Sequence, residues 1–474
     1  MVVGEIRTVT DTLILGAGPG GYVAAIRASQ LGREVTLVER EESPGGICLN
    51  HGCIPSKALI HAANFYHSTL HSEKMGIRAG SVGLDMKALQ EWKRGVVNKL
   101  TDGVRKLLVG NGIQVVRGNL NFTDDHTARV ETDGGVSILE FKNLVIASGS
   151  HPVELEELKF DGEGIISSRQ ALELEEVPDT LLVVGGGYIG LELGTVYAKL
   201  GSRVTVVELL DGLLPGTDTE LVRVVDRRLK KLGVKVMLES RVAGCEKLPE
   251  GYRVDVQGKK GSSQLEASKI LVTVGRKPNT SGFGLEKTGV ELDDRGFIKV
   301  DNRMRTNVSH IYAIGDVAGE PLLAHKASKE AIVAVENIAG LSSAKDWLLI
   351  PSVIFTDPEI ATAGMGEDEA KEKGYEVVIG KFPFAASGRA LTMGEFDGFV
   401  KIVASEGDGR VLGVHIVGPD ASNCISEAAI AIELTATLED VALTVHPHPT
   451  LPESLMEAAE VALGRPIHIL KRLS

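Results

Sequence analysis

The sequence predicts an α/β protein of several domains, in which one strand–turn–helix–strand unit is used twice. The chain has 474 residues, enough for about three domains of the usual ~150 residues. An apolar run, a Gly-rich turn and an apolar helix follow one another near the N-terminus and again from about Leu181. From about Pro351 onward, apolar β-type runs alternate with helical patterns and no such turn occurs, which predicts a separate α+β domain.

The composition excludes several classes of protein. Hydrophobic residues make up 43% and charged residues 24%, close to the average of folded globular proteins. The formal net charge of -13 offers phosphate backbones no general attraction, so we expect no nucleic acid partner. No apolar run reaches the ~18 residues of a membrane span, and the N-terminus lacks the pattern of a signal peptide. We therefore expect a cytoplasmic protein without a membrane partner.

The repeated unit carries the same residues in both copies, at one constant offset. The shared positions are Gly16, Gly18, Gly21 and Glu39 in the first copy and Gly185, Gly187, Gly190 and Glu208 in the second. In each copy the glycines lie between an apolar β-type run and a helical pattern, and a second β-type run ends in the glutamate. One such motif alone can be an ordinary glycine turn, but two in register, each with its acid, indicate two βαβ units.

Each residue that the two copies share has a physical role in holding a dinucleotide. The first glycine forms the tight turn, the second lets the backbone approach a pyrophosphate, and the third lets the helix pack on the strand. The helix N-terminus then holds the phosphates. The final glutamate accepts hydrogen bonds from a ribose diol and would repel a 2'-phosphate. The chain should therefore bind two dinucleotides.

Further strands and one helix are predicted between and after the two units. Residues 85–118 have apolar positions at helical spacing and then a β-type run, which predicts a helix and a strand that ends at Gly118. Residues 141–152, 269–279 and 311–317 are predicted strands that run into glycine. Such strand ends place backbone beside a bound ligand.

Two cysteines, Cys48 and Cys53, lie in the segment GGICLNHGCIPSK. Their spacing alone permits metal binding, redox chemistry or coincidence. Zinc is disfavoured because no C-x-x-C spacing and no second pair accompany them, whereas two buried structural thiols remain an alternative. A helix that begins near Cys53 would place its sulfur in the field of the helix N-terminus and favour the thiolate. Lys57, about one turn later, would share that face.

Near the C-terminus, the segment HPHPTLPE places His448 and Glu453 in a short, stiff stretch. The glutamate could hold one imidazole nitrogen by a hydrogen bond and leave the other as a base near neutral pH. A surface histidine in a proline-rich turn is the simpler interpretation of this segment by itself. The cysteine pair favours the base, because thiol chemistry needs one.

Together, several segments resemble those of a known family, the flavin disulfide reductases. The segments GAGPGG, GGICLNHGCIPSK, GGGYIGLELG, VGRKPNT, YAIGDV, LAHKAS and HPTLPE match that family in order and spacing, from about Asp11 to Ile469. The resemblance implies an FAD-binding domain over residues 1–150 and an NAD-binding domain over residues 151–280. It further implies a central domain over residues 281–350 that completes the FAD site, and an interface domain over residues 351–474 that forms a homodimer.

The resemblance also implies roles for single residues, none of them as a metal ligand. The residues expected to bind one non-covalent FAD per subunit are Gly16, Gly18, Gly21, Glu39, Lys57, Gly118, Ser148, Gly149, Asp316, Leu323, Ala324 and His325. Those expected to bind NAD are Gly185, Gly187, Gly190, Glu208, Val242 and Gly275. The implied catalytic residues are Cys48 and Cys53 as a redox disulfide, His448 and Glu453 as an acid/base pair, and Lys57 and Glu192 as an ion pair beside the flavin.

Of these residues, Cys48 would exchange with the substrate and Cys53 would touch the flavin. Glu192 has the alternative interpretation of an ordinary acid in the first turn of a helix. The sequence departs from the family's usual residues at four positions: Ile47, His51, Ser148 and Pro452. Pro452 directly precedes Glu453 and so bears on where that carboxylate lies.

The implied activity is the oxidation of protein-bound dihydrolipoamide to lipoamide, with hydride passed to NAD+. This is the task of the flavoprotein component of 2-oxo acid dehydrogenase complexes, so the implied partners are the lipoyl domain and the subunit-binding domain of the dihydrolipoyl acyltransferase. A glutathione- or trypanothione-reductase-like enzyme is an alternative, which Glu208 disfavours. A chiefly structural assembly subunit is another, which the complete set of reacting residues disfavours.

Overall fold

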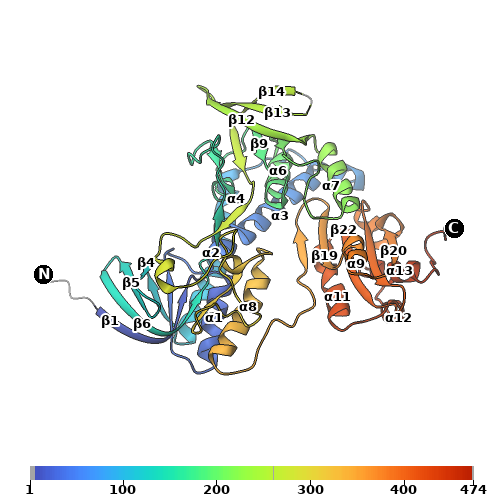
Figure 1. The fold of residues 1–474 in the computed structure, drawn as a ribbon. Coiled ribbons are helices and arrows are strands. Elements are labelled where there is room, and N and C mark those ends of the chain that lie inside the picture. The colour runs from blue at the N-terminus through green and yellow to red at the C-terminus, as the bar shows by residue number, and fades with distance from the viewer. Residues whose placement is uncertain (1–5, 260, 472–474) are drawn as a thin grey trace.

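The computed structural model describes residues 6–259 and 261–471, and their helices and strands gather around three large sheets (Figure 1). The first is a seven-stranded sheet with the order β3-β2-β1-β6-β5-β4, and β17 pairs with β6. Its strands are β1 (Ile6–Leu15), β2 (Val35–Glu39), β3 (Gln114–Arg117), β4 (Asn119–Phe122), β5 (Thr127–Thr132), β6 (Gly135–Ile146) and β17 (Ile311–Ala313). The strands β3, β2, β1 and β6 pair in parallel, as β17 does with β6. Strand β5 pairs antiparallel with β6, and β4 pairs antiparallel with β5.

Helices α1 (Pro19–Gln30) and α8 (Ala324–Ile338) pack against each other beside this sheet (Figure 1). Because β17 and α8 come from residues 281–350, the segment expected as a central domain adds its strand to the first sheet. The helix expected within residues 85–118 is α4 (Met86–Gly110), and the strand after it is β3. Asp85 caps α4, since its side chain accepts a hydrogen bond from the Ala88 amide at 3.0 Å.

The second large sheet is parallel, with the order β11-β10-β9-β15-β8. Its strands are β8 (Ile165–Ile166), β9 (Thr180–Val184), β10 (Arg203–Val207), β11 (Lys235–Met237) and β15 (Lys269–Val272). A meander of β12 (Ser240–Lys247), β13 (Tyr252–Gly258) and β14 (Gly261–Ala267) projects beyond it, at the top of Figure 1. The chain enters and leaves this part through two paired antiparallel strands, β7 (Ser150–Pro152) and β16 (Arg276–Pro278).

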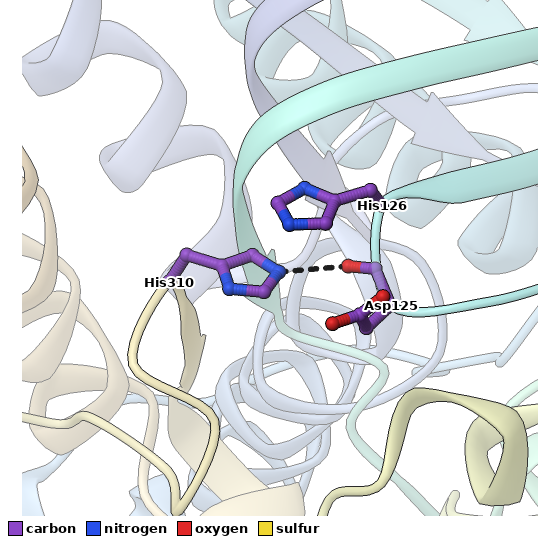
Figure 2. A group of neighbouring side chains, drawn as sticks. All are labelled: Asp125, His126 and His310. Carbon is purple, nitrogen blue, oxygen red and sulfur yellow. Dashed lines mark hydrogen bonds between the residues drawn. The ribbon is translucent and has the colours of Figure 1, made fainter.

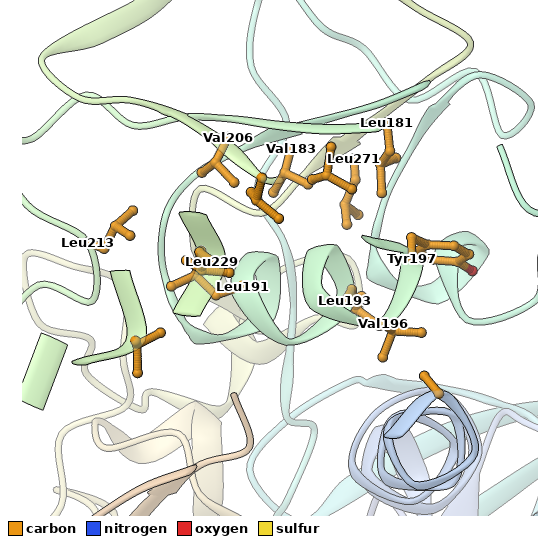
Figure 3. Packing of buried hydrophobic residues seen from close by; sticks show 14 of the residues in the cluster. Leu181, Val183, Leu191, Leu193, Val196, Tyr197, Val206, Leu213, Leu229 and Leu271 are labelled. Atoms are coloured by element: carbon orange, nitrogen blue, oxygen red, sulfur yellow. The ribbon is translucent and has the colours of Figure 1, made fainter. Parts of the chain in front are cut away.

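Helix α6 (Tyr188–Leu200) is buried on almost all sides against the second sheet. Figure 3 shows four of its residues, Leu191, Leu193, Val196 and Tyr197, packed beneath Leu181, Val183, Val206 and Leu271 of the strands. A helix that is apolar all round belongs in a core. Burial of each such side chain contributes roughly 1.5–3 kcal/mol, so this packing holds the second glycine turn firmly at the N-terminus of α6.

The third sheet is antiparallel, with the order β18-β19-β22-β21-β20, which confirms the α+β pattern predicted after Pro351. Its strands are β18 (Ser352–Ile354), β19 (Glu359–Gly364), β20 (Val377–Pro383), β21 (Phe399–Ser405) and β22 (Val411–Gly418). Helices α11 (Ala421–Glu433), α12 (Leu438–Leu443) and α13 (Glu453–Ala462) pack with them. Within the described residues, no helix is long and apolar enough to cross a membrane.

The turn between β4 and β5 is tied to the segment that leads into β17 by a pair of stacked histidines (Figure 2). The rings of His126 and His310 lie face to face, with centroids 3.9 Å apart. His310 Nε2 lies 2.8 Å from the Asp125 carbonyl, and His126 Nδ1 lies 3.0 Å from the Phe141 carbonyl. Each ring therefore donates one N–H to a backbone oxygen, and together they fasten the late strand β17 to the early sheet.

Candidate functional site

The two glycine-rich turns repeat each other down to single hydrogen bonds. In the first, Glu39 accepts hydrogen bonds from the amides of Ala17, at 2.7 Å, and Glu41, at 2.9 Å. In the second, Glu208 accepts them from the amides of Gly186, at 2.6 Å, and Leu210, at 2.7 Å. Each carboxylate oxygen thus accepts one hydrogen bond from the backbone, and its second lone pair stays available to a ribose diol.

The glycines of both turns fall into two groups by what an added Cβ atom would meet. At Gly16, Gly21, Gly185 and Gly190 it would lie between 1.7 and 2.6 Å from a backbone carbonyl oxygen of the chain itself. At Gly187 it would meet nothing, and at Gly18 only the Gly46 Cα at 4.0 Å. The protein's own packing therefore explains the first and third glycines, and the open space at the second is where a pyrophosphate would pass.

We predict different outcomes for alanine at Gly187 and at Gly190. Gly187→Ala should have the same thermal unfolding temperature as the wild type. It should bind NAD+ about tenfold more weakly or worse, because its methyl group would occupy the space of the pyrophosphate. Gly190→Ala should lower the stability by about 1–3 kcal/mol, because its methyl group would lie 2.3 Å from the Gly185 oxygen. Thermal unfolding and calorimetric titration with NAD+ measure both effects. Wild-type NAD+ affinity in Gly187→Ala would contradict the expected path of the cofactor.

A large cavity of about 1760 Å³ opens beside the second turn. Its lining includes Gly185, Gly187, Glu208, Val242 and Gly275, five of the residues expected to bind NAD. Gly190 lies behind them, buried in α6. The cavity exceeds the ~300–1,000 Å³ of common ligand pockets, so it has room for a ligand as large as an extended dinucleotide.

Around the first turn, three helices begin without a side-chain cap: α1 after Gly18, α3 (Cys53–Leu70) after Gly52, and α8 after Leu323. The first turns of these helices therefore offer backbone amides to phosphate or carbonyl oxygens of a ligand, except at Pro19 and Pro55, which have no N–H. Lys57 lies in the first turns of α3, and Ala324 is the first residue of α8. This donor set fits the diphosphate and ring oxygens of FAD.

The remaining residues expected to bind FAD make contacts within the protein that can be described one by one. Gly149 has φ +74° and open space where a Cβ would be, and Ser148 donates a hydrogen bond to the Asn279 carbonyl at 2.8 Å. Asp316 accepts one from Ser150. His325 donates one to the Pro351 carbonyl at 2.8 Å. At Gly118, a Cβ would lie 2.4 Å from the Glu131 oxygen, so strand packing already explains that glycine.

The cysteine pair spans a break between two helices, α2 (Gly46–His51) and α3. Gly52 separates them with φ −146° and ψ −107°, which are not helical values. Helix α3 begins at Cys53, as the sequence predicts. The break brings the two thiols close enough for each to shift the pKa of the other, which an uninterrupted helix would prevent because residues five apart lie on different faces.

The two sulfurs have opposite electrostatic environments. The neighbouring Cys48 thiol lowers the pKa of Cys53, and the Lys57 ammonium lowers it further against the effect of burial. The neighbouring Cys53 thiol and burial raise the pKa of Cys48. As a whole residue Cys53 is more exposed than Cys48, but neighbouring protein still surrounds its thiol closely enough for burial to oppose ionisation. The pair therefore holds its thiolate on Cys53.

Lys57 and Glu192 form the ion pair expected from the sequence, with 2.8 Å between Nζ and Oε2. The Glu192 side chain is only 5% exposed, and its other oxygen accepts a hydrogen bond from the Phe355 amide at 2.9 Å. The Lys57 ammonium also lies 4.3 Å from the centre of the Phe355 ring. Glu192 is thus more than a first-turn acid, because it orients the lysine that faces Cys53.

His448 and Glu453 make the predicted contact, with Nδ1 and Oε1 2.9 Å apart. Glu453 is the first residue of α13 and also accepts a hydrogen bond from the Thr450 amide at 2.7 Å. Burial opposes ionisation of Glu453, but these two hydrogen bonds outweigh it and lower its pKa. The His448 side chain is 78% exposed. While Nδ1 contacts Glu453, its Nε2 is therefore open to the surroundings of the C-terminal domain.

The structure therefore joins the cysteines with Lys57 and Glu192, and His448 with Glu453, as two separate groups. Among the described residues, no hydrogen bond or ion pair links these two groups within one chain. Sequence reasoning missed Phe355, which contacts Lys57 and Glu192. It also missed Tyr188, which lines the cavity beside Gly187. Single aromatic residues carry no pattern that could have identified either one.

Comparisons with known proteins agree over the full chain. The family model described as pyridine nucleotide-disulphide oxidoreductase matches residues 10–331, and the model of its dimerisation domain matches residues 350–459. Curated relatives called dihydrolipoyl dehydrogenase, from Geobacillus stearothermophilus and Haloferax volcanii, are 50% and 52% identical, over 100% of this chain and of each relative.

Solved structures give the same result for the fold. LpdA from Mycobacterium tuberculosis has a TM-score of 0.89 and 29% identity, and the HOCl-induced flavoprotein disulfide reductase RclA from Escherichia coli has a TM-score of 0.85 and 26% identity. Both matches cover 95% of this chain and 99% of the other.

Proposed function

The chain belongs to the pyridine nucleotide-disulphide oxidoreductase family, and from this premise we propose that it oxidises dihydrolipoamide to lipoamide and reduces NAD+ to NADH. The observation that carries the proposal is the Cys48–Cys53 pair, in which two free thiols meet across the break between α2 and α3 and the pKa of Cys53 is lowered. This is the arrangement of a dithiol that exchanges with a substrate dithiol. Full-length relatives that share half of the sequence carry the name of this activity.

FAD and NAD are the cofactors. The first glycine turn, Glu39 and the starts of α1, α3 and α8 would hold FAD, and the second turn with Glu208 would hold NAD. When bound there, FAD would supply the two-electron redox chemistry between the dithiol and the nicotinamide.

The chain's own residues supply the proton transfers and the disulfide exchange. Glu453 would keep the His448 proton on Nδ1, so Nε2 would take the proton from one dihydrolipoamide thiol. That thiolate would attack Cys48 of the oxidised pair, the bond between Cys48 and Cys53 would break, and Cys53 would leave as a thiolate. The second substrate thiol would then displace Cys48 and give lipoamide, and Cys48 would leave with the proton of that thiol. Lys57, held by Glu192, would stabilise the Cys53 thiolate once it has formed.

The dimerisation domain over residues 350–459 supports a homodimer. Because no hydrogen bond or ion pair joins His448 to either cysteine within the part of the chain that the structure describes, we propose that His448 serves the cysteine pair of the partner subunit. We further propose that the partners are the lipoyl domain, which would carry the dihydrolipoamide, and the subunit-binding domain of a dihydrolipoyl acyltransferase. The relatives' shared name supports this assignment.

Turnover of free dihydrolipoamide tests the proposed function directly. The purified, flavin-coloured homodimer should form NADH from dihydrolipoamide and NAD+, and it should use NADP+ far less well because Glu208 opposes a 2'-phosphate. Absorbance at the NADH band measures both rates. A flavoprotein that binds NAD+ but leaves dihydrolipoamide unoxidised would refute the proposal.

Removing the charge of Glu208 should narrow the preference for NAD+. In Glu208→Gln the ratio of kcat/KM for NAD+ to that for NADP+ should fall about tenfold or more, because the amide no longer repels the 2'-phosphate. Glu39→Gln is the matched control, since it occupies the same place in the first turn. It should weaken retention of the flavin and leave the NAD+/NADP+ ratio unchanged.

A further inference from the structure

One wall of the cavity beside the second glycine turn is the segment of residues 209–218, which we call the wall segment. It begins directly after Glu208 and leads into helix α7 (Thr219–Lys231). Most of its residues line the cavity. Two hydrogen bonds hold its first part and its middle. The Leu210 amide donates to the Glu208 carboxylate at 2.7 Å, and the Leu214 amide donates to the Gly186 carbonyl at 3.0 Å. The position of the wall segment therefore shapes the site around Glu208.

The middle of the wall segment is held in an unfavourable conformation. Leu214 has φ +50°, in the left-handed region that costs a non-glycine residue about 1 kcal/mol or more. Such a conformation persists only where surrounding contacts impose it. The Leu214 side chain is 3% exposed and the Thr217 amide donates to its carbonyl at 3.0 Å, so contacts on both sides contribute.

The far end of the wall segment is anchored to another part of the molecule. One oxygen of Asp218 caps α7 by accepting a hydrogen bond from the Glu220 amide at 2.8 Å. The other accepts one from Nζ of Lys401, at 2.9 Å. Lys401 belongs to β21 of the third sheet. The wall segment is thus tied at one end to the NAD-binding sheet and at the other to the dimerisation domain.

Lys401 is well suited to hold this end. Its side chain is 6% exposed, and besides Asp218 it contacts Glu220 at 3.0 Å and Glu367 at 3.5 Å. Burial disfavours the ammonium, but the hydrogen bonds to Asp218 and Glu220 outweigh burial and raise the pKa of Lys401. Removal of Lys401 would leave the three neighbouring carboxylates, Asp218, Glu220 and Glu367, without the cation that they share, so they would repel one another.

We propose that Lys401 is a positioning residue for the pyridine nucleotide. From the third sheet it holds Asp218, and through Asp218 it holds the wall segment against the glycine turn at Gly186 and Glu208. It would set the affinity for NAD+ without reacting with it. The inference deepens the proposed function, on which it rests for the identity of the nucleotide.

The test is Lys401→Met in the FAD-loaded homodimer. The KM for NAD+ should rise about tenfold, which corresponds to about 1.4 kcal/mol of lost binding. The kcat and the KM for dihydrolipoamide should stay within about twofold, since the cysteine pair contacts neither Lys401 nor Asp218. Calorimetric titration with NAD+ should show the same loss as the KM. Lys401→Arg, which keeps a cation, should recover most of the affinity.

Lys381 provides the matched control. It donates to Glu220 at 2.9 Å, like Lys401, but it is 40% exposed and has no bond to Asp218. Lys381→Met should leave the KM for NAD+ within about twofold. If Lys401→Met does not fold, Asp218→Asn removes the same ion pair from the other side and should raise the KM for NAD+ similarly. When both variants fold, their double mutant should lose less affinity than the sum of the two.

Three results would overturn the proposal. The first is unchanged NAD+ affinity in both Lys401→Met and Asp218→Asn, and the second is an equal loss of affinity in Lys381→Met. The third is a fall in kcat together with a rise in the KM for dihydrolipoamide as well as for NAD+, because that pattern indicates general disorder. The outcomes are separable from those of the proposed function. If the wild type fails to oxidise dihydrolipoamide, the function is wrong, while the calorimetric comparison with NAD+ still decides the role of Lys401.

Discussion

Cys48→Ser should abolish dihydrolipoamide turnover, while the protein keeps its flavin and gains a long-wavelength absorption band. A serine oxygen cannot form the disulfide through which the substrate dithiol exchanges. The lowered pKa of Cys53 leaves a thiolate at the start of α3, where it would lie against the flavin. Cys53→Ser should lose turnover as completely but lack the band. Visible spectra of the two variants and NADH formation measure these effects.

Acid titration of Cys48→Ser checks the electrostatic part of this prediction. A depressed pKa means that the thiolate survives to lower pH than in an ordinary cysteine, so the band should disappear only below the usual cysteine range. Lys57→Met in the same background should move that loss to higher pH. Cys424→Ser, at a buried cysteine in α11, is the control and should retain wild-type turnover and spectrum. Identical spectra in Cys48→Ser and Cys53→Ser would show that the two sulfurs are assigned wrongly.

Mixing two inactive variants should restore activity if the site is shared between subunits. His448→Gln removes the base and should lower turnover about 10²–10⁴-fold. A Cys48→Ser chain refolded together with a His448→Gln chain would form mixed dimers in which one site carries both defects and the other none. With random pairing, about half of the dimers are mixed and each has one intact site, so recovery should approach about a quarter of the wild-type rate.

The control for this experiment measures how many mixed dimers form. With a size tag on one of the two chains, gel filtration should show mixed dimers in the expected proportion. If mixed dimers form and activity stays at the level of the parents, His448 serves its own chain and the shared site is wrong. Glu453→Gln mixed with Cys48→Ser should behave like His448→Gln, though from a higher residual rate, because Glu453 only orients the imidazole.

Much of the fold follows from local patterns in the sequence. The glycine turns, the helix within residues 85–118 and the helix start at Cys53 depend on neighbouring residues along the chain, whose spacing determines which backbone conformations are possible. The repeat predicted two equivalent units, and the matching hydrogen bonds of Glu39 and Glu208 agree with that. The contact between His448 and Glu453 also lies within one short segment, and Pro452 does not displace it.

Other features were decided only by the tertiary structure. Residues 281–350 add β17 to the first sheet, and the Phe355 amide fixes Glu192. The glycine at position 118 is needed by packing against Glu131, which no motif shows. Lys401 meets Asp218 although nothing in either local sequence points to the other. Sequence periodicity describes which face of an element is apolar, but contacts between distant elements depend on how the sheets pack and on which buried charges must find partners.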